Sequence, residues 1–193
     1  YEGIVPVERF TFSSSTELQQ HTLEQIAQGK EGFVVKKPGS SYAQDAWYVE
    51  GKRNSDWIKL KRQVTFDLVA LGTYLTPKRK QQGWPVSNVL LGTYNEQTER
   101  FETMVKMNVP NQSVAEELYD HIAPHCAENI DQQVQYAPKI PTAKAPAIYV
   151  QNPLQNGKVI EVTAMDVTSP AKSWHSCGIE DGQVHSLRQP VYV

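Results

Sequence analysis

Apolar and polar residues alternate along several short stretches of the chain, and a period of two is typical of β-strands. In the N-terminal third, the alternation predicts strands over residues 1–12 and 57–61, and the β-forming residues Phe33, Val34 and Val35 predict a strand over 31–37. The strand over 57–61 is amphipathic, so we expect its apolar residues Ile58 and Leu60 to be buried. The opposite face, on which both lysines point the same way, consists of Trp57, Lys59 and Lys61.

Helical spacing replaces the alternation between the first two strands. Thr16 with Gln19 three residues later forms a capping-box pattern, and Gly29 is a typical helix terminator. We therefore predict a helix that begins at Thr16 and ends near Gln28. The residues expected to face inward are Leu18, Leu23, Ile26 and Ala27.

The remaining two thirds of the chain contain more strands and one further helix. Strands are predicted over residues 66–74, 86–94, 100–107, 147–150, 158–167 and 184–187. The polar turn 95–99 would join the second and third of these as a hairpin. Residues 76–83 are expected to form a basic loop, and residues 124–146 a loop with little regular structure. Ser113 with Glu116 predicts the start of the helix, directly after the third strand.

Five or so short strands with a helix after the third are typical of the oligonucleotide/oligosaccharide-binding (OB) barrel. The fold class that we expect is therefore mixed α+β and mostly β, with the barrel in the C-terminal part. Fold alone does not identify function.

Composition restricts the class of protein only broadly. The 193 residues are 39% hydrophobic and 21% charged, which suits one globular domain, or one domain and part of another. No apolar run approaches the ~20 residues needed to cross a membrane. Cys126 and Cys177 have no metal-binding spacing, so we expect reduced, buried thiols.

Charge is segregated along the chain although the net charge is only −2. Residues 52–80 are rich in lysine and arginine, whereas residues 96–131 are rich in glutamate and aspartate. Local fields matter more than total charge for binding a polyanion, so a basic face is expected. A solvated lysine-rich surface remains the alternative.

The chemistry-bearing residues concentrate between residues 31 and 62. Glu31 stands beside a glycine at a strand start, where a carboxylate can reach a divalent cation or a ribose hydroxyl. Lys59 and Lys61 form a compact pair of positive charges that suits phosphate groups. The residues alone leave two plainer interpretations open: a solvated acid at a strand end, and an amphipathic edge strand.

Residues 31–36 (EGFVVK) resemble nucleotidyltransferase motif IV of the ATP-dependent DNA ligases, and residues 48–61 resemble their motif V. The similarity continues through residues 67–74, which resemble the first barrel strand of that family. Residues 159–162 are similar to a late barrel strand, and residues 186–190 to the start of motif VI. The resemblance thus covers nearly the whole chain. It implies the C-terminal portion of an adenylation domain over 1–63 and an OB-fold DNA-binding domain over 64–193.

By this resemblance, Glu31 would help to hold Mg²⁺, while Lys59 and Lys61 would contact the α-phosphate of ATP and the phosphate of AMP. Lys36 and Arg188 would also contact the nucleotide. DNA would be bound by Lys52, Arg53, Arg62, Lys78, Arg79 and Lys80.

The resemblance implies nick sealing in double-stranded DNA by adenylyl transfer, as in replication, repair and recombination. The nucleophilic lysine of the family lies in a Lys-x-Asp-Gly motif that does not occur here, so we expect it on an upstream part of the same ligase. The fragment alone should not self-adenylate. An intracellular protein with no membrane partner is implied, nuclear in a eukaryote and otherwise cytoplasmic. The alternatives are a non-catalytic OB module that binds nucleic acid or protein, and an RNA ligase or capping-type nucleotidyltransferase.

Overall fold

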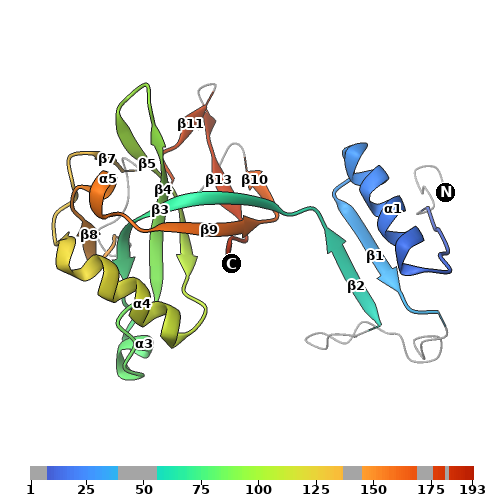
Figure 1. The fold of residues 1–193 in the computed structure, drawn as a ribbon, viewed down its shortest axis with the longest axis horizontal. Coiled ribbons are helices and arrows are strands. Elements are labelled where there is room, and N and C mark those ends of the chain that lie inside the picture. The colour runs from blue at the N-terminus through green and yellow to red at the C-terminus, as the bar shows by residue number, and fades with distance from the viewer. Residues whose placement is uncertain (1–7, 39–55, 137–144, 169–175, 181–182) are drawn as a thin grey trace, which may run out of the picture. The chain divides into compact units, whose positions relative to one another are not determined.

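A computed structural model describes residues 8–38, 56–136, 145–168, 176–180 and 183–193 (Figure 1). The chain divides into two compact units, Tyr1–Arg62 (unit 1) and Gln63–Val193 (unit 2). Each unit is described by itself. The assignment of the units to an adenylation domain and a DNA-binding domain stays a prediction.

Unit 1 contains helix α1 (Ser15–Ala27), which begins and ends for local reasons. Its N-cap is Ser14, whose hydroxyl accepts a hydrogen bond from the backbone N–H of Glu17, so the predicted cap at Thr16 is wrong. Ser14 has extended backbone angles whereas the next residue is helical, and that change defines a cap. Gly29 has φ +85° and follows the helix as predicted.

The inward face of α1 differs in part from the prediction. The half-buried positions are Leu18, His21, Thr22, Gln25 and Ile26. These lie three or four residues apart, which is one helical stripe. Leu23 is 61% exposed and Ala27 is also exposed, because both lie outside that stripe.

Two antiparallel strands form the sheet of unit 1: β1 (Gly32–Lys36) and β2 (Trp57–Lys61). Both strands were predicted, β1 from its β-forming residues and β2 from its alternation. The early strand over 1–12 is not observed in its described part, since residues 8–12 have no strand, and residues 1–7 lie outside the described ranges.

Unit 2 is a curled β-sheet built around β3 (Val64–Tyr74), which pairs with β4 (Asn88–Asn95), β8 (Ile148–Val150) and β9 (Val159–Ala164). β5 (Arg100–Asn108) completes a hairpin with β4. The short sheet strands are β6 (Cys126–Ala127), β7 (Val134–Gln135) and β14 (Val191–Tyr192). Two further antiparallel sheets have two strands each. One consists of β10 (Asp166–Thr168) and β13 (Ser186–Arg188), and the other of β11 (Ile179–Glu180) and β12 (Gln183–Val184).

Helix α4 (Gln112–Ile122) follows the third barrel strand, β5, and continues into the 3₁₀ turn Ala123–His125. A short helix, α5 (Pro153–Asn156), follows β8. The mostly β class and the barrel with one helix after its third strand are therefore confirmed (Figure 1). The cap of α4 is Asn111, which accepts from the N–H of Val114 at 3.0 Å, so the predicted cap at Ser113 is wrong.

Three further predictions need correction in unit 2. Residues 76–83 contain helix α3 (Pro77–Gln81), which begins at a proline, the residue that suits the first helical position. The strand over 158–167 is two strands, β9 and β10, because Met165 separates them. The loop over 124–146 contains β6 and β7 in its described part.

Apolar residues cover both faces of the β3–β4–β5 sheet. One cluster packs with α4 and includes Leu68, Leu91 and Leu118. The other includes Leu71, Tyr74 and Phe101 and packs with β7. The register of β3 against β4 shifts between Ala70 and Gly72, and this irregularity lets Ala70 and Leu71 both be fully buried.

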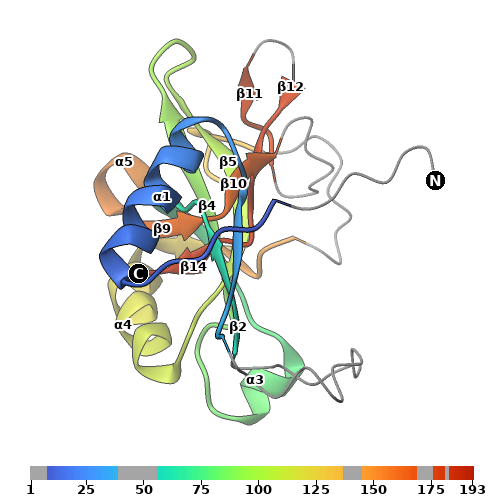
Figure 2. The same cartoon turned by 90° about the vertical axis from the view of Figure 1, so that its right-hand side faces the viewer.

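α3 and the turn of the β4–β5 hairpin lie at opposite ends of β4 (Figure 2).

Cys177 is buried and Cys126 half-buried, and neither forms a disulfide. Burial raises the pKa of Cys126 to about 11. Among the described residues, no helix has the length and apolar character that a membrane crossing requires.

Candidate functional site

The predicted nucleotide-contacting residues of unit 1 share one face of the β1–β2 sheet. The register pairs Gly32 with Lys61, Val34 with Lys59, and Lys36 with Trp57. Residues opposite each other in an antiparallel pair project to the same side. This face, the charged face, therefore gathers Lys36, Trp57, Lys59 and Lys61, with Glu31 directly before β1.

Gly32 is required where Glu31 enters the sheet. Its φ is +148°, and a Cβ atom there would lie 2.2 Å from the carbonyl oxygen of Leu60. Any side chain would push β2 away from β1. The glycine thus lets the strand carrying Glu31 approach the strand carrying the two lysines.

Glu31 and Lys61 form an ion pair, with Lys61 Nζ 2.7 Å from Glu31 Oε1. The Glu31 side chain is 72% exposed, and exposed pairs of this kind contribute only about 0.2–1 kcal/mol. A ligand with phosphate groups could therefore displace the carboxylate from Lys61 at little cost. The predicted metal-holding group and one predicted phosphate contact are held side by side.

Lys36 lies over the ring of Trp57, with Nζ 4.0 Å from the ring centroid. This cation–π contact contributes about 0.5–1 kcal/mol at an exposed site and fixes the direction of the Lys36 side chain. The alternation over residues 57–61 predicted that Trp57 lies on the lysine face, but it did not predict this contact. The contact depends on the register of β1 against β2, which pairs Lys36 with Trp57.

The opposite face of the sheet is less buried than predicted. Leu60 is half-buried, but Ile58 is 55% exposed. α1 contacts this side near Phe33, whose ring centroid lies 5.8 Å from that of His21. The prediction that the apolar pair is buried is wrong for Ile58, which the described residues of unit 1 do not cover.

The remaining predicted site residues lie elsewhere. Lys52 and Arg53 fall outside the described residues. Arg62 is exposed directly after β2, and Arg188 is exposed on β13 of unit 2. Lys78, Arg79 and Lys80 are grouped on α3, where the Arg79 guanidinium carbon lies 3.5 Å from the ring centroid of Trp84. The structure thus brings together Glu31, Lys36, Lys59 and Lys61, and groups the α3 cations separately.

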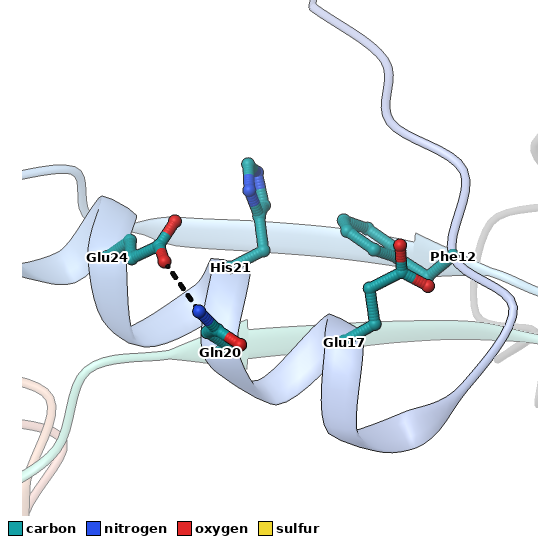
Figure 3. Close-up of a pocket in the computed structure, with 5 residues that line it drawn as sticks. All are labelled: Phe12, Glu17, Gln20, His21 and Glu24. Atoms are coloured by element: carbon teal, nitrogen blue, oxygen red, sulfur yellow. Dashed lines mark hydrogen bonds between the residues drawn. The ribbon is translucent and has the colours of Figure 1, made fainter.

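A shallow pocket of about 270 Å³ on α1 contains none of the predicted site residues (Figure 3). It is lined by Phe12, Glu17, Gln20, His21 and Glu24, and Gln20 donates a hydrogen bond to Glu24 at 3.1 Å. Two carboxylates and no cation make it unsuitable for phosphate. The charged face is chemically the better candidate, because it carries Lys36, Lys59 and Lys61.

A metal ion at the charged face would depend on Glu31. In the described part of the chain, no three or more His, Cys, Asp or Glu side chains converge as a ligand set. Mg²⁺, however, commonly uses one or two carboxylates together with substrate phosphates and water. The exposed carboxylate of Glu31, beside two lysines that can bind phosphate, fits that donor set.

Comparison with known proteins shows which proteins the chain is similar to. Residues 2–61 match the family model of the ATP dependent DNA ligase domain. The chain is 29% identical over 175 residues to the DNA ligase of Saccharolobus solfataricus, covering 87% of this chain and 27% of that protein. It is 29% identical over 191 residues to a probable DNA ligase of Dictyoglomus thermophilum, covering 90% and 28%. The chain thus spans about a quarter of the length of these relatives.

A solved structure, Pmar-Lig_PreS3, shares the fold with a TM-score of 0.53 and 16% identity, covering 95% of this chain and 31% of that one. The mostly β fold is therefore known from another chain. The matched domain contains the β1–β2 sheet, and the ligase relatives extend over most of the chain. The resemblance predicted from the sequence is confirmed: residues 2–61 match the ATP dependent DNA ligase domain, and the chain is similar to DNA ligases over most of its length.

Proposed function

We propose that this chain is the C-terminal part of the catalytic core of a ligase that seals nicks in double-stranded DNA with ATP. A lysine on an upstream part of the same ligase attacks the α-phosphorus of ATP and pyrophosphate leaves. The AMP then passes to the 5′-phosphate at the nick. Finally the 3′-hydroxyl attacks that phosphate and AMP departs.

The observation that carries the proposal is the charged face. Lys59 and Lys61 project from alternate positions of β2 onto the same side as Lys36. Positive charge fixed beside a transferring phosphoryl group stabilises the charge that develops in the transition state. In this role Lys59 and Lys61 bind the α-phosphate, and Lys36 binds the nucleotide. The contact with Trp57 fixes the direction of the Lys36 side chain.

Glu31 would hold Mg²⁺, which when bound supplies positive charge to the phosphate oxygens. The step for this chain's own residues is an exchange of partners. Phosphate binding takes Lys61 away from Glu31, to which it is paired at 2.7 Å. Arg188 would add a further nucleotide contact.

DNA binding is assigned to the cations of both units. Lys78, Arg79 and Lys80 form a compact basic group on α3, and Arg62 is exposed after β2. Contacts to the DNA backbone suit an enzyme that acts on any sequence, and they should weaken steeply with salt. Lys52 and Arg53 are proposed for the same role from the resemblance alone.

The test joins this chain to an upstream segment that carries Lys-x-Asp-Gly and measures formation of the labelled AMP adduct from labelled ATP. We expect Lys59→Ala and Lys61→Ala to lower adduct formation by about a hundredfold, as loss of one preorganised stabilising group typically does. The matched control is Lys37→Ala, since Lys37 is exposed one residue beyond β1. Unchanged labelling in both lysine variants, or no label in the joined protein, would reject the proposal and favour a non-catalytic OB module.

A further inference from the structure

Helix α3 ends in a turn that ties it to Trp84. The Gly83 N–H donates to the Lys80 carbonyl at 3.0 Å, and the Trp84 N–H donates to the Arg79 carbonyl at 3.0 Å. Gly83 has φ +78°, the left-handed conformation that this turn requires. The two bonds form a Schellman motif, in which the residue after the glycine commonly contacts the third residue from the helix end. Trp84 and Arg79 occupy those two positions.

The contact between these two side chains is a cation–π contact. The Arg79 guanidinium carbon lies 3.5 Å from the ring centroid of Trp84. Trp84 is half-buried and packs against the apolar cluster that contacts α4, so its ring is held in place. Lys78 and Lys80 are exposed, and among the described residues neither has a cation–π contact. Arg79 is therefore the α3 cation whose direction is fixed.

The base of the loop that contains α3 is closed as well. The Ser87 N–H donates to the Tyr74 carbonyl at 2.8 Å, and the Ser87 hydroxyl accepts from the Thr76 N–H at 3.1 Å. A helix of five residues is not stable in water by itself, so these bonds and the contact at Trp84 hold α3 in place. A loop that is ordered before its ligand arrives loses less conformational entropy on binding.

The guanidinium of Arg79 has hydrogen-bond donors that the rest of the fold does not use. Among the described residues, no ion pair or side-chain hydrogen bond involves it. A guanidinium that lies on an aromatic face keeps its N–H groups available to acceptors, and their fork matches two oxygens of a phosphate. Residues 68–95 contain no aspartate or glutamate, so the sequence around α3 supplies no competing carboxylate.

We propose that Trp84 is a positioning residue for DNA binding. It holds the Arg79 guanidinium so that two N–H groups donate to one phosphate of the DNA backbone. Lys78 and Lys80 add positive charge around this contact without fixing the position of the phosphate. The inference rests on the proposed DNA binding by α3, and it names the contact that determines the affinity there.

The test titrates a fluorescent nicked duplex with the whole chain and follows anisotropy at several salt concentrations. Arg79→Lys keeps the charge and the packing of Trp84 but loses the planar fork, so we expect binding to weaken about tenfold. Lys78→Gln and Lys80→Gln each remove a charge, yet each should weaken binding less than Arg79→Lys does. Each should also make the dependence of log Kd on log salt less steep by about one unit.

Arg100→Lys is the matched control. Arg100 is exposed on β5 at the turn end of the β4–β5 hairpin, and α3 lies at the other end of β4 (Figure 2). The same substitution there should leave the affinity for the duplex unchanged. A tenfold loss in the control as well would mean that arginine is preferred over lysine wherever it occurs, and the assigned contact would be wrong.

Trp84 is tested without any change of charge. Trp84→Leu should weaken binding about as much as Arg79→Lys, whereas Trp84→Phe keeps an aromatic face and should keep most of the affinity. The double variant Arg79→Lys/Trp84→Leu should bind about as well as either single variant, because both substitutions act on one contact. A merely structural role of Trp84 would instead multiply the two losses.

The outcomes separate this inference from the proposed function. Wild-type affinity in Arg79→Lys overturns the inference, as does multiplication of the two losses in a folded double variant, while DNA binding by the wild type stands. Arg79→Lys and Trp84→Phe decide the question if Trp84→Leu does not fold. If the wild-type chain itself does not bind the nicked duplex, the proposed DNA binding is wrong and this inference with it.

Discussion

The two units differ in where their apolar residues lie. Among residues 8–38 and 56–62 of unit 1, no residue is fully buried, and Val34, Trp57 and Ile58 are each at least 41% exposed. In unit 2, apolar residues are packed on both faces of the central sheet. Isolated two-stranded sheets are marginally stable in water. The charged face therefore lies on a scaffold whose described residues contribute little packing, while the unit with the dense core carries none of the predicted catalytic residues Glu31, Lys59 and Lys61.

The largest effect should come from the core of unit 2. Leu91→Ala removes a side chain that is 0% exposed, and we expect a loss of about 2–5 kcal/mol in the free energy of unfolding. Urea denaturation measures it. The matched control Leu23→Ala, on α1 with 61% exposure, should change the free energy by less than about 0.5 kcal/mol. Equal losses in the free energy of unfolding for the two variants would show that the two units do not differ in core packing.

Gly32→Ala should open the β1–β2 sheet. The new Cβ meets the Leu60 carbonyl oxygen, and φ +148° is strained for alanine, so we expect a local loss of about 2–3 kcal/mol. Hydrogen exchange should show reduced protection of β1 and β2 amides and unchanged protection in β3–β5. Gly29→Ala is the control, since that site has φ +85° but open space around it. An equal loss of protection in both variants would mean that close approach at residue 32 is unimportant.

Alkaline pH should act on unit 2. Burial raises the pKa of Tyr74 to about 12. Above pH 10 the unfolded chain releases this proton while the folded chain keeps it, so stability is complete below pH 10 and falls as the pH rises from 10 to 12. After allowance for solvent screening, the loss is roughly 1–2 kcal/mol.

Tyr74→Phe removes this titration, so its stability should fall less steeply over the same pH window when urea denaturation is repeated at each pH. A slope as steep as that of the wild type would show that Tyr74 is not responsible. In the described part of unit 1 there is no tyrosine, so hydrogen exchange in β1 and β2 should lack this contribution.

The smallest effect on stability should come from Glu31→Gln. Its ion pair with Lys61 is exposed, and we expect a change of about 0.2–1 kcal/mol, decreasing with added salt. Adduct formation in the joined protein should nevertheless fall strongly. Glu8→Gln breaks the similar 2.9 Å pair with Lys30 away from the charged face, so it should change stability as little as Glu31→Gln does and leave adduct formation unchanged. Unfolding of the Glu31 variant would assign that residue a structural role instead.

Strand alternation and turn chemistry were sufficient to predict much of the fold. The alternation over Trp57–Lys61 predicted which side chains share the charged face, and the polar turn at 95–99 predicted the β4–β5 hairpin. The caps were less predictable, because several neighbouring residues could serve equally well. Ser14 and Asn111 cap their helices since the backbone turns there, which the sequence does not specify.

Burial was harder to predict than strand positions. Ile58 belongs to an apolar face by its pattern, yet what covers a face depends on other segments. Glu102 was one acid among several between residues 96 and 131. Its burial depends on the contact of β5 with residues 177 and 178, which are remote in sequence: the Cys177 N–H donates to the carbonyl of Thr103 at 2.7 Å. No local pattern reports such a contact.

The pairing of Gly32 with Lys61 and of Lys36 with Trp57 also limits how this protein can change in length. Successive strand residues point to opposite sides, so one residue inserted within β2 would move its lysines to the side that α1 contacts. It would also bring a side-chain-bearing residue of β1 against the backbone where only Gly32 fits. Substitutions can be accepted singly along these strands, whereas an insertion or deletion of one residue would invert the charged face as a whole.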